Sequence, residues 1–470
     1  MLAALDEAPL TRRYYMLVAV VMVGAVLDFF DLFLIAFIVP VVSDEWDLTF
    51  GEASVVLLSA GVGAILGSIL WGRAGDRYGR KKPLIVGIVT FSLATGGLTL
   101  APEGGWWYMG LLRLVVGAGG AGVAVMAVPL MLEFTPTRLR TKLTGFVTTA
   151  MVPVGILVAA GSAALLIDPL GWRPLFAIGV LPIGLAFLVM RIAPESPRWL
   201  IDQGRPDEAR QVIAWLIRRD ERDLAIEAPS ATEHEQSYGA LMRYRSSVVL
   251  TVVSWLGASV AVAGLVLWGP TFLEQILDID PDNAAALFIL VTLGSFTGRL
   301  FFSFAPDRIG RRRAGMIMGF GAAPLLALAG VSGDTEVGGV PVFLLALVAA
   351  AFFVDGGFAN LTPYTPEIYP TSLRTHGMGL AWAVSGLGRI VGPLLIGVIA
   401  GSGDVVDPAA TAGAQLPAFL ILAGFALTVG LAFLVIRLET HGTDLETLSA
   451  RFVEETDRPP DAPRAAAQPG

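Results

Sequence analysis

The segment GDRYGRKK at residues 75–82 follows directly after a long apolar stretch, and PDRIGRRR at 306–313 holds the same position 231 residues later. A second pair of matching segments, EFTPTRLR at 133–140 and EIYPTSLR at 367–374, is offset by 234 residues. Two motifs that repeat at nearly one offset, each in the same place relative to the apolar stretches, indicate a chain built of two similar halves.

The composition around these motifs is that of a membrane protein. Apolar residues make up 55% of the 470 residues and charged residues only 15%, and the mean hydropathy is +0.70. A water-soluble core could not hide so much apolar surface. Stretches near the roughly 20 residues that a helix needs to cross a bilayer recur about twelve times, at 16–42, 53–73, 83–101, 106–133, 143–167, 174–193, 246–275, 282–304, 314–331, 341–368, 376–400 and 415–438. We therefore predict an all-α polytopic membrane protein of twelve transmembrane helices in two pseudo-symmetric six-helix bundles.

The domain boundaries follow from the polar segments. We expect a cytoplasmic N-terminus at 1–15, a first bundle at 16–193, a cytoplasmic linker with short helices at 194–245, a second bundle at 246–438 and a disordered cytoplasmic tail at 439–470. The first apolar stretch is too long for a cleaved signal, so we interpret it as retained. Duplicated bundles around a site near the bilayer midplane are typical of secondary transporters.

The positive charges predict the orientation, because cytoplasmic loops retain an excess of Lys and Arg. These residues cluster after the second, fourth and eighth apolar stretches, whereas the intervening loops, such as DEWDLTFGE and SGDTEVGG, lack them, with Arg173 as the sole exception. Both termini are thus predicted to lie in the cytoplasm, with the protein in the cell's inner membrane.

The motifs resemble those of the major facilitator superfamily, and within it the sugar-porter-like and metabolite:proton symporter branches. GDRYGRKK is similar to the loop motif of that superfamily, PESPRWL at 194–200 to the sugar-porter signature, and PYTPEIYPTSLRTHGMG at 363–379 to the junction of the tenth and eleventh helices. The resemblance covers residues 16–438. It implies a network of charge-assisted hydrogen bonds that holds the cytoplasmic side shut, formed by Asp76, Arg77, Arg80, Glu133, Arg140, Glu195, Arg198, Asp307, Arg308, Glu367 and Arg374, which we call the gate residues. For Arg80, Lys81 and Lys82 the alternative is a basic loop that only sets topology.

Charged residues well inside an apolar stretch are candidates for function, because each costs about 2.5–3.5 kcal/mol on insertion scales. The candidates are Asp28, Asp31, Arg113, Arg299, Asp355 and Arg389.

Asp28 and Asp31 are three residues apart, which places both carboxylates on one helical face. Two such anions in a low dielectric cannot both ionise cheaply, so we expect one of them to hold a proton readily. Their segment resembles the first helix of aromatic-acid:proton symporters, although Phe29 and Phe30 depart from that pattern. In the resembling proton-coupled porters Asp31 and Arg113 occupy positions that pair, so we predict proton coupling by Asp31, assisted by Asp28 and Arg113. The alternative is a static ion pair that ties two helices together.

Arg389 and Asp355 are the candidates in the second half. A guanidinium fork suits a substrate carboxylate, so we predict that Arg389 clamps one; its alternative role is to pair with Asp355. Asp355 stands near Gly356, Gly357 and Pro363, which loosen a helix, and we expect it and Arg113 to face the central cavity. Arg299 is nearer the cytoplasmic end and is assigned to the gate. The aromatic residues Phe29, Phe33, Trp268, Tyr364 and Trp382 could form the walls for a flat substrate.

These features predict a proton-coupled symporter of a small organic metabolite, an organic or aromatic acid, that works by alternating access as a monomer in the lipid bilayer. A sugar is one alternative, but pyranose recognition needs side-chain amides, and the segment at 252–272 of the seventh stretch has no Gln or Asn and the fifth stretch has no Gln. An organic cation bound by Asp355 or Asp28 is a second alternative, and a non-transporting sensor a third. Neither the chemistry of an enzyme, nor a metal site, nor a cofactor, nor nucleic-acid binding is indicated, and the chain has no cysteine.

Overall fold

The computed structural model describes residues 10–221, 224, 238–370 and 373–440, with backbone alone at 128–129, 132, 137–150, 202, 238 and 375. The first half contains α2 (Arg12–Trp46), α3 (Phe50–Tyr78), α4 (Lys81–Leu98), α5 (Trp106–Glu133), α6 (Thr137–Leu170), α7 (Arg173–Ile178) and α8 (Pro182–Ile192). A cap of two short helices follows, α9 (Pro197–Asp202) and α10 (Pro206–Ile217), and a further short helix, α11 (Tyr238–Leu241), packs against the second half.

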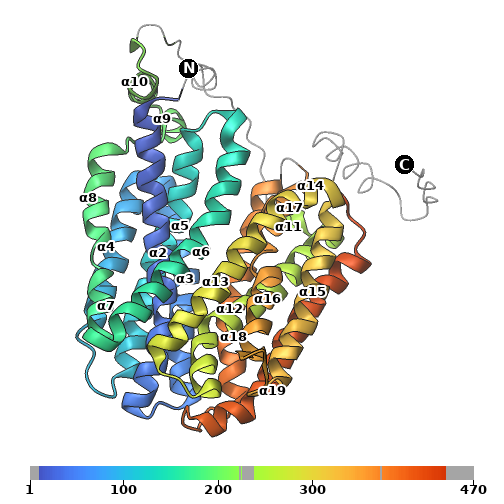
Figure 1. Ribbon diagram of the computed structural model, residues 1–470. Coiled ribbons are helices and arrows are strands. Elements are labelled where there is room, and N and C mark those ends of the chain that lie inside the picture. Colours follow the sequence, from blue (N-terminus) through green and yellow to red (C-terminus); the bar gives the residue numbers. More distant parts are fainter. Residues whose placement is uncertain (1–9, 222–223, 225–237, 371–372, 441–470) are drawn as a thin grey trace, which may run out of the picture.

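The second half repeats this order, and the two bundles stand side by side (Figure 1). It contains α12 (Arg245–Leu277), α13 (Pro281–Phe304), α14 (Pro306–Ile309), α15 (Arg311–Val331), β1 (Glu336–Val337), β2 (Val340–Pro341), α16 (Val342–Val354), α17 (Phe358–Glu367), α18 (Arg374–Ile399) and α19 (Pro408–Val435). Within the described residues, eleven helical segments are long and apolar enough to cross a membrane. The helix α4, which begins at two lysines, packs between α5 and α8 and completes the first bundle.

Two helices are interrupted where the sequence contains glycine or proline. The break between α16 and α17 falls at Asp355–Gly357, as the glycines there predict. The break between α7 and α8 falls before Pro182, and it was not predicted. Helix α5 instead continues through its small residues and uses them for packing. A Cβ on Gly117 would lie 1.9 Å from the carbonyl oxygen of Ala60, so glycine alone lets α5 and α3 approach this closely.

One loop adds a small element to the all-helical fold. Between α15 and α16 the chain forms a two-stranded hairpin in which Glu336 pairs with Pro341 and Val337 with Val340. Gly338 and Gly339 form its turn with φ values of 63° and 79°, a left-handed conformation that two-residue hairpins require and that glycine adopts without strain. The Gly-Gly pair in the loop between two apolar stretches carries this signal, which the apolar periodicity does not.

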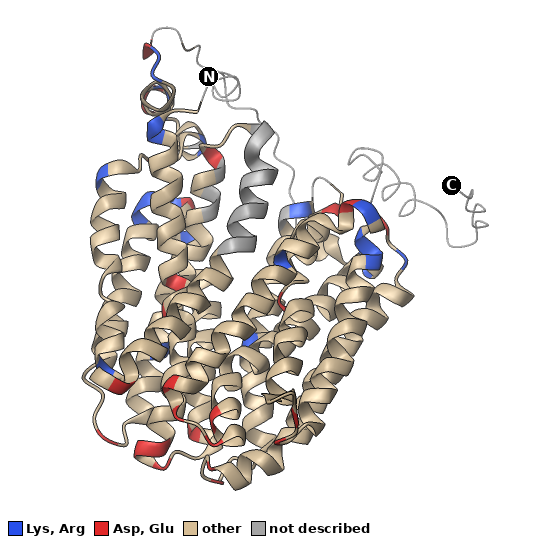
Figure 2. Cartoon of the chain, in the orientation of Figure 1, with Lys and Arg blue, Asp and Glu red and all other residues tan. Residues whose placement is uncertain are grey.

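Charge separates the two ends of the molecule (Figure 2). One end, which we call the acidic end, carries Asp and Glu in the loops at 43–52, 101–105, 279–283, 332–339 and 401–407. The opposite end, the basic end, carries the repeated motifs at 75–82 and 306–313 together with α9, α10, α14 and α17.

The halves are joined at the acidic end and have separate cores at the basic end. One cluster of buried apolar residues contains side chains of both halves, from Phe37 in α2 to Phe288 in α13, whose rings are 5.5 Å apart. Backbone hydrogen bonds reinforce this contact, with Phe50 donating to Asp404 at 2.9 Å and Val406 donating to Leu48 at 2.9 Å. Toward the basic end, the first half has a core of its own that includes α9 and α10, and the second half has another.

Candidate functional site

Asp31 lies at a fully buried point of α2, between α4 and α5. Its Oδ1 accepts a hydrogen bond of 2.7 Å from the hydroxyl of Thr95, while its Oδ2 is buried and has no hydrogen-bond partner among the described residues. A buried carboxylate oxygen without a donor is costly, and binding a proton there lowers the cost. The sequence pattern does not predict Thr95, because a threonine in an apolar stretch carries no charge to single it out.

Arg113 of α5 is also fully buried and contacts the same turn of α2. Its Nη1 donates to the main-chain carbonyl of Asp31 at 3.0 Å and its Nη2 to that of Leu32 at 2.8 Å. The guanidinium therefore binds the backbone of α2, and the alternative of a static carboxylate–guanidinium pair does not form. Arg113 remains close enough to interact electrostatically with both Asp31 and Asp28.

Asp28 lies one turn earlier on the same face of α2 and is partly exposed. Its Oδ1 lies against α5 at Gly120, where an added Cβ would approach it to 2.3 Å. The carboxylate interacts electrostatically with Asp31 and Arg113 of its own half and with Arg389 of the other half. Asp28 thus connects the proton candidate Asp31 to the interface between the halves.

Arg389 reaches that interface from α18 of the second half and is partly exposed as well. Its backbone packs against Gly61 of α3, so α18 and α3 meet at this point. The neighbouring Ser385 accepts a hydrogen bond of 2.8 Å from Ser259 of α12. Arg389 and Asp28 are opposite charges on opposite halves, at a place where both remain accessible.

The structure corrects the predicted roles of Asp355 and Arg299. Asp355, 2% exposed, forms a bidentate pair with Arg299, 5% exposed, through bonds of 2.8 Å from Nε to Oδ2 and 2.6 Å from Nη2 to Oδ1. Asp355 therefore does not pair with Arg389, and both of its oxygens are occupied. Arg299 belongs to this pair inside the second half, because its long side chain reaches across to the break between α16 and α17.

The aromatic candidates are divided between different regions. Phe29 and Phe33 stack with their rings 6.4 Å apart beside Asp28. Trp382, 48% exposed, lies one turn of α18 from Ser385 and 5.6 Å from Trp255. These three residues can wall a substrate site.

Two other aromatic residues do not lie in that region. Trp268 is fully buried against Phe50 in the contact that joins the halves. Tyr364 lies at the basic end, where its hydroxyl donates to the carbonyl of Leu438 at 2.7 Å. The prediction that both line the substrate site is therefore corrected for this conformation: each ring is enclosed by side chains of the protein.

The gate residues of the first half form a network around Arg80. The Arg80 guanidinium lies 3.6 Å from Asp76 and 3.9 Å from Glu133, and Glu195 accepts hydrogen bonds from the backbone of Arg80 and Lys81 at the start of α4. Burial raises the pKa of Glu133, whereas a hydrogen bond with Ser196 and the positive charges of Arg80 and Arg198 act in the opposite direction.

The second half repeats this network. Arg311 binds Glu367 at 3.1 Å, and Glu439 accepts hydrogen bonds from the backbone of Arg311 and Arg312 at the start of α15. Glu195 and Glu439 are thus equivalent residues, a match that the repeated motifs alone do not reveal. The side chain of Arg140 lies outside the described residues. Each of these contacts remains within one half, so the networks brace the separate basic ends.

The fold and this site define a class: a multi-pass membrane transporter of the major facilitator fold. The xylose transporter XylE from E. coli, in a partially occluded inward-open conformation, superposes with a TM-score of 0.71 at 18% identity, covering 92% of this chain and 100% of that one. The sequence profile of the family "Sugar (and other) transporter" matches residues 17–452, and the chain belongs to that family.

Curated relatives of the chain transport small metabolites. The niacin transporter NiaP of Acinetobacter baylyi is 29% identical over 84% of this chain and 89% of its own. The 4-hydroxybenzoate transporter PcaK of the same organism is 27% identical over 84% of this chain and 88% of its own. The predicted superfamily, fold and non-enzymatic class are thereby confirmed, and the chain is a metabolite transporter.

Proposed function

We propose that the chain is a proton-coupled symporter of a small organic acid. The observation that carries this proposal is the electrostatic interaction between Asp28 and Arg389, which come from opposite halves and remain partly exposed. A carboxylate substrate that binds Arg389 competes with Asp28 for the guanidinium. When the substrate takes up the positive charge of Arg389, the negative charges of Asp28 and its neighbour Asp31 are less compensated. Proton binding to these carboxylates then becomes more favourable.

The nature of the relatives supports the substrate class. Proteins named as transporters of niacin, cis,cis-muconate, 4-hydroxybenzoate and gallate are among them. Each of these compounds carries a carboxylate, and three are aromatic, which suits a site with an arginine beside Phe29, Phe33 and Trp382. Carriage of a monoanion with one proton moves no net charge, so a response to the membrane potential requires a second proton. Asp28 and Asp31 together offer two carboxylates for this purpose.

We also assign the basic end to the cytoplasm, following the excess of Lys and Arg there. Both ends of the chain then lie in the cytoplasm. Because the halves join at the acidic end and have separate cores at the basic end, this conformation is the inward-facing state of an alternating-access cycle. We expect a monomer in the inner membrane.

Asp31→Asn tests the coupling. A thermal-shift screen of aromatic acids, organic cations and sugars identifies a ligand, and the purified wild type and variant are reconstituted in liposomes with it. We expect the variant to lose uptake driven by a pH gradient and to retain exchange of labelled for unlabelled substrate, because exchange needs no net proton movement. Concentrative uptake at the wild-type rate would refute the role of Asp31. A screen in which sugars or cations alone stabilise the protein would refute the substrate class.

A further inference from the structure

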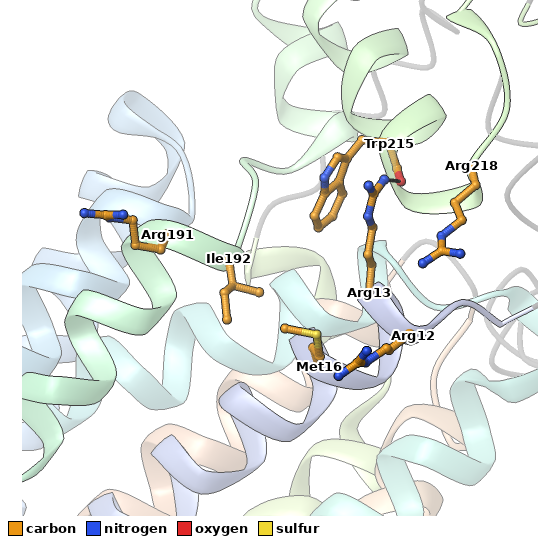
Figure 3. A pocket seen from close by; sticks show the side chains of 7 residues that line it. All are labelled: Arg12, Arg13, Met16, Arg191, Ile192, Trp215 and Arg218. Atoms are coloured by element: carbon orange, nitrogen blue, oxygen red, sulfur yellow. Dashed lines mark hydrogen bonds between the residues drawn. The ribbon is translucent and has the colours of Figure 1, made fainter.

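A pocket with a volume of about 410 Å³ lies at the basic end, outside the substrate site (Figure 3). Its walls come from the start of α2, the end of α8 and the end of α10. It is lined by Arg12, Arg13, Met16, Arg191, Ile192, Trp215 and Arg218. Four of these seven residues are arginines and none is acidic, so the pocket concentrates positive charge.

Two of the arginines are held by contacts that leave their charge uncompensated. Arg13 donates to the main-chain carbonyl of Trp215, and its guanidinium lies 4.9 Å from the centre of the Trp215 ring. Arg191 lies in the same way 4.9 Å from the ring of Phe187. Among the described residues, none of the four arginines of this pocket forms an ion pair with a carboxylate.

The pocket is a built part of the fold. Thr11, just before α2, donates from its hydroxyl to the carbonyl of Leu216 at 2.8 Å, which fastens α10 onto the end of α2. Arg218 closes α10 in a left-handed conformation with φ of 56°. These contacts hold like charges together, and a bound anion would compensate their mutual repulsion.

The surface next to the pocket indicates what kind of anion the pocket can bind. Met16 in the pocket is 41% exposed, and the neighbouring Tyr15, Phe187 and Met190 are 57%, 53% and 49% exposed. They lie on membrane-spanning helices, on the turns next to the pocket, where acyl chains are the apolar solvent. A ligand that fits both surfaces has a negatively charged head and an apolar body.

We propose that this pocket binds the phosphodiester headgroup of an anionic phospholipid from the leaflet at the basic end. Arginine forks match phosphate oxygens in bidentate geometry, and basic pockets between transmembrane helices bind such headgroups. The lipid joins α2, α8 and α10, and α2 carries Asp28 and Asp31. The bound headgroup thus stabilises the first half as one body with its cap.

Native mass spectrometry and thermal unfolding of the purified full chain test the site, with phosphatidylglycerol, phosphatidylcholine and inorganic phosphate as separate additions. We expect phosphatidylglycerol to bind and to raise the unfolding temperature, with little effect of the other two. The double variant Arg191→Gln with Arg218→Gln should weaken phosphatidylglycerol binding on the order of 30-fold, because each of the two substitutions removes one electrostatic contact with the headgroup.

Arg243→Gln with Arg245→Gln is the matched control, because both arginines lie at the basic end and outside the pocket. The single variant Arg218→Gln, at an exposed position, serves if the double variant fails to fold, and a several-fold loss is expected for it. Unchanged phosphatidylglycerol binding in the variant that folds would overturn the proposal. An equal response of the wild type to inorganic phosphate would overturn the lipid assignment in favour of a site for free phosphate.

Discussion

The two halves of this transporter treat buried charge in opposite ways. In the second half, Arg299 and Asp355 form a closed bidentate pair in which both carboxylate oxygens have a donor. In the first half, Arg113 binds backbone carbonyls of α2, and the Asp31 carboxylate has one oxygen bound by Thr95 and one without a described donor. The halves share a fold, a loop motif and a glutamate that accepts hydrogen bonds from the first residues of their third helix. They differ in whether their buried carboxylate has a donor for both of its oxygens.

The difference separates a structural role from a functional one. In the closed pair both groups already have partners, so a change of protonation brings no new interaction. The pair therefore holds its two helices in one arrangement. An incompletely satisfied carboxylate changes its interactions when a proton binds, so it can bias one conformation over another. We therefore propose that protons bind in the first half, whereas the closed pair keeps the second half rigid.

The largest expected effect is on the closed pair. Asp355→Leu removes the carboxylate that compensates the buried charge of Arg299, which costs about 3–5 kcal/mol. We expect a large drop in the unfolding temperature of the purified protein. The double variant Asp355→Leu with Arg299→Met should regain most of it, because removing both charges restores an apolar contact. In contrast, Asp31→Asn should leave the unfolding temperature nearly unchanged. Equal destabilisation by Asp31→Asn would remove the distinction between the halves.

Arg389 gives the next largest effect. Because a charge-assisted hydrogen bond contributes about 1.5–3 kcal/mol, Arg389→Ala should weaken binding of an anionic substrate by roughly ten- to hundredfold. Arg389→Lys should retain an intermediate affinity, since an ammonium keeps the charge and loses the fork. Isothermal titration with the acid found in the screen measures both variants. Wild-type affinity in Arg389→Ala would exclude the clamp.

Gly120 allows the approach of Asp28 to α5, which gives a milder test. In Gly120→Ala the new Cβ would lie 2.3 Å from Asp28 Oδ1, so the carboxylate must move. We expect proton-driven uptake to fall on the order of ten-fold, as for a moderate overpacking of about 1–3 kcal/mol. Gly161→Ala on α6 is the control, because its Cβ would meet nothing within 4 Å. A loss shared by both variants would show a general sensitivity of helices to alanine, unconnected with Asp28.

Much of the architecture was predictable from the sequence, because the repeated motifs, the apolar stretches and the asymmetry of Lys and Arg are all local patterns. The break at Asp355 was likewise predictable from the two glycines that follow it. The hairpin at Gly338 and the break before Pro182 were missed, because each depends on two or three residues, the first in a loop between apolar stretches and the second within one.

The candidate site was predictable as a set of residues and not as a set of contacts. The rule that charges inside a span are exceptional selected Asp28, Asp31, Arg113, Arg299, Asp355 and Arg389. Which of them pair depends on helix rotation and on the reach of each side chain, since Arg299 and Asp355 lie 56 positions apart on different helices. No spacing rule in a single sequence distinguishes that pair from the alternative with Arg389.

The smallest expected effect concerns two carboxyl groups at the acidic end, where the halves join. Glu274 of α12 is 4% exposed and faces Asp44 of α2, with Asp280 near it, and the amide of Gln275 donates to Asp44 at 3.4 Å. Both halves thus contribute an acidic side chain to one contact. No basic side chain of the described residues is among the groups that act on Glu274 there. A proton on Glu274 would let its carboxyl group donate to Asp44 and hold the contact, whereas an ionised Glu274 would weaken the contact by repulsion.

Lower pH should therefore favour closure of the acidic end and higher pH should loosen it, by about 1 kcal/mol, because solvent at the exposed Asp44 screens the interaction. In Glu274→Gln the amide replaces the protonated acid, so closure should no longer depend on pH. Because the chain has no cysteine, spin labels on Asp47→Cys and Asn283→Cys report the distance across this end directly. The distance can respond to pH equally in the protein with Glu274 and in the Glu274→Gln variant only if the proton that holds the acidic end closed binds elsewhere. Asp31 is then the group to examine, because a proton on Asp31 also biases the equilibrium between the two conformations.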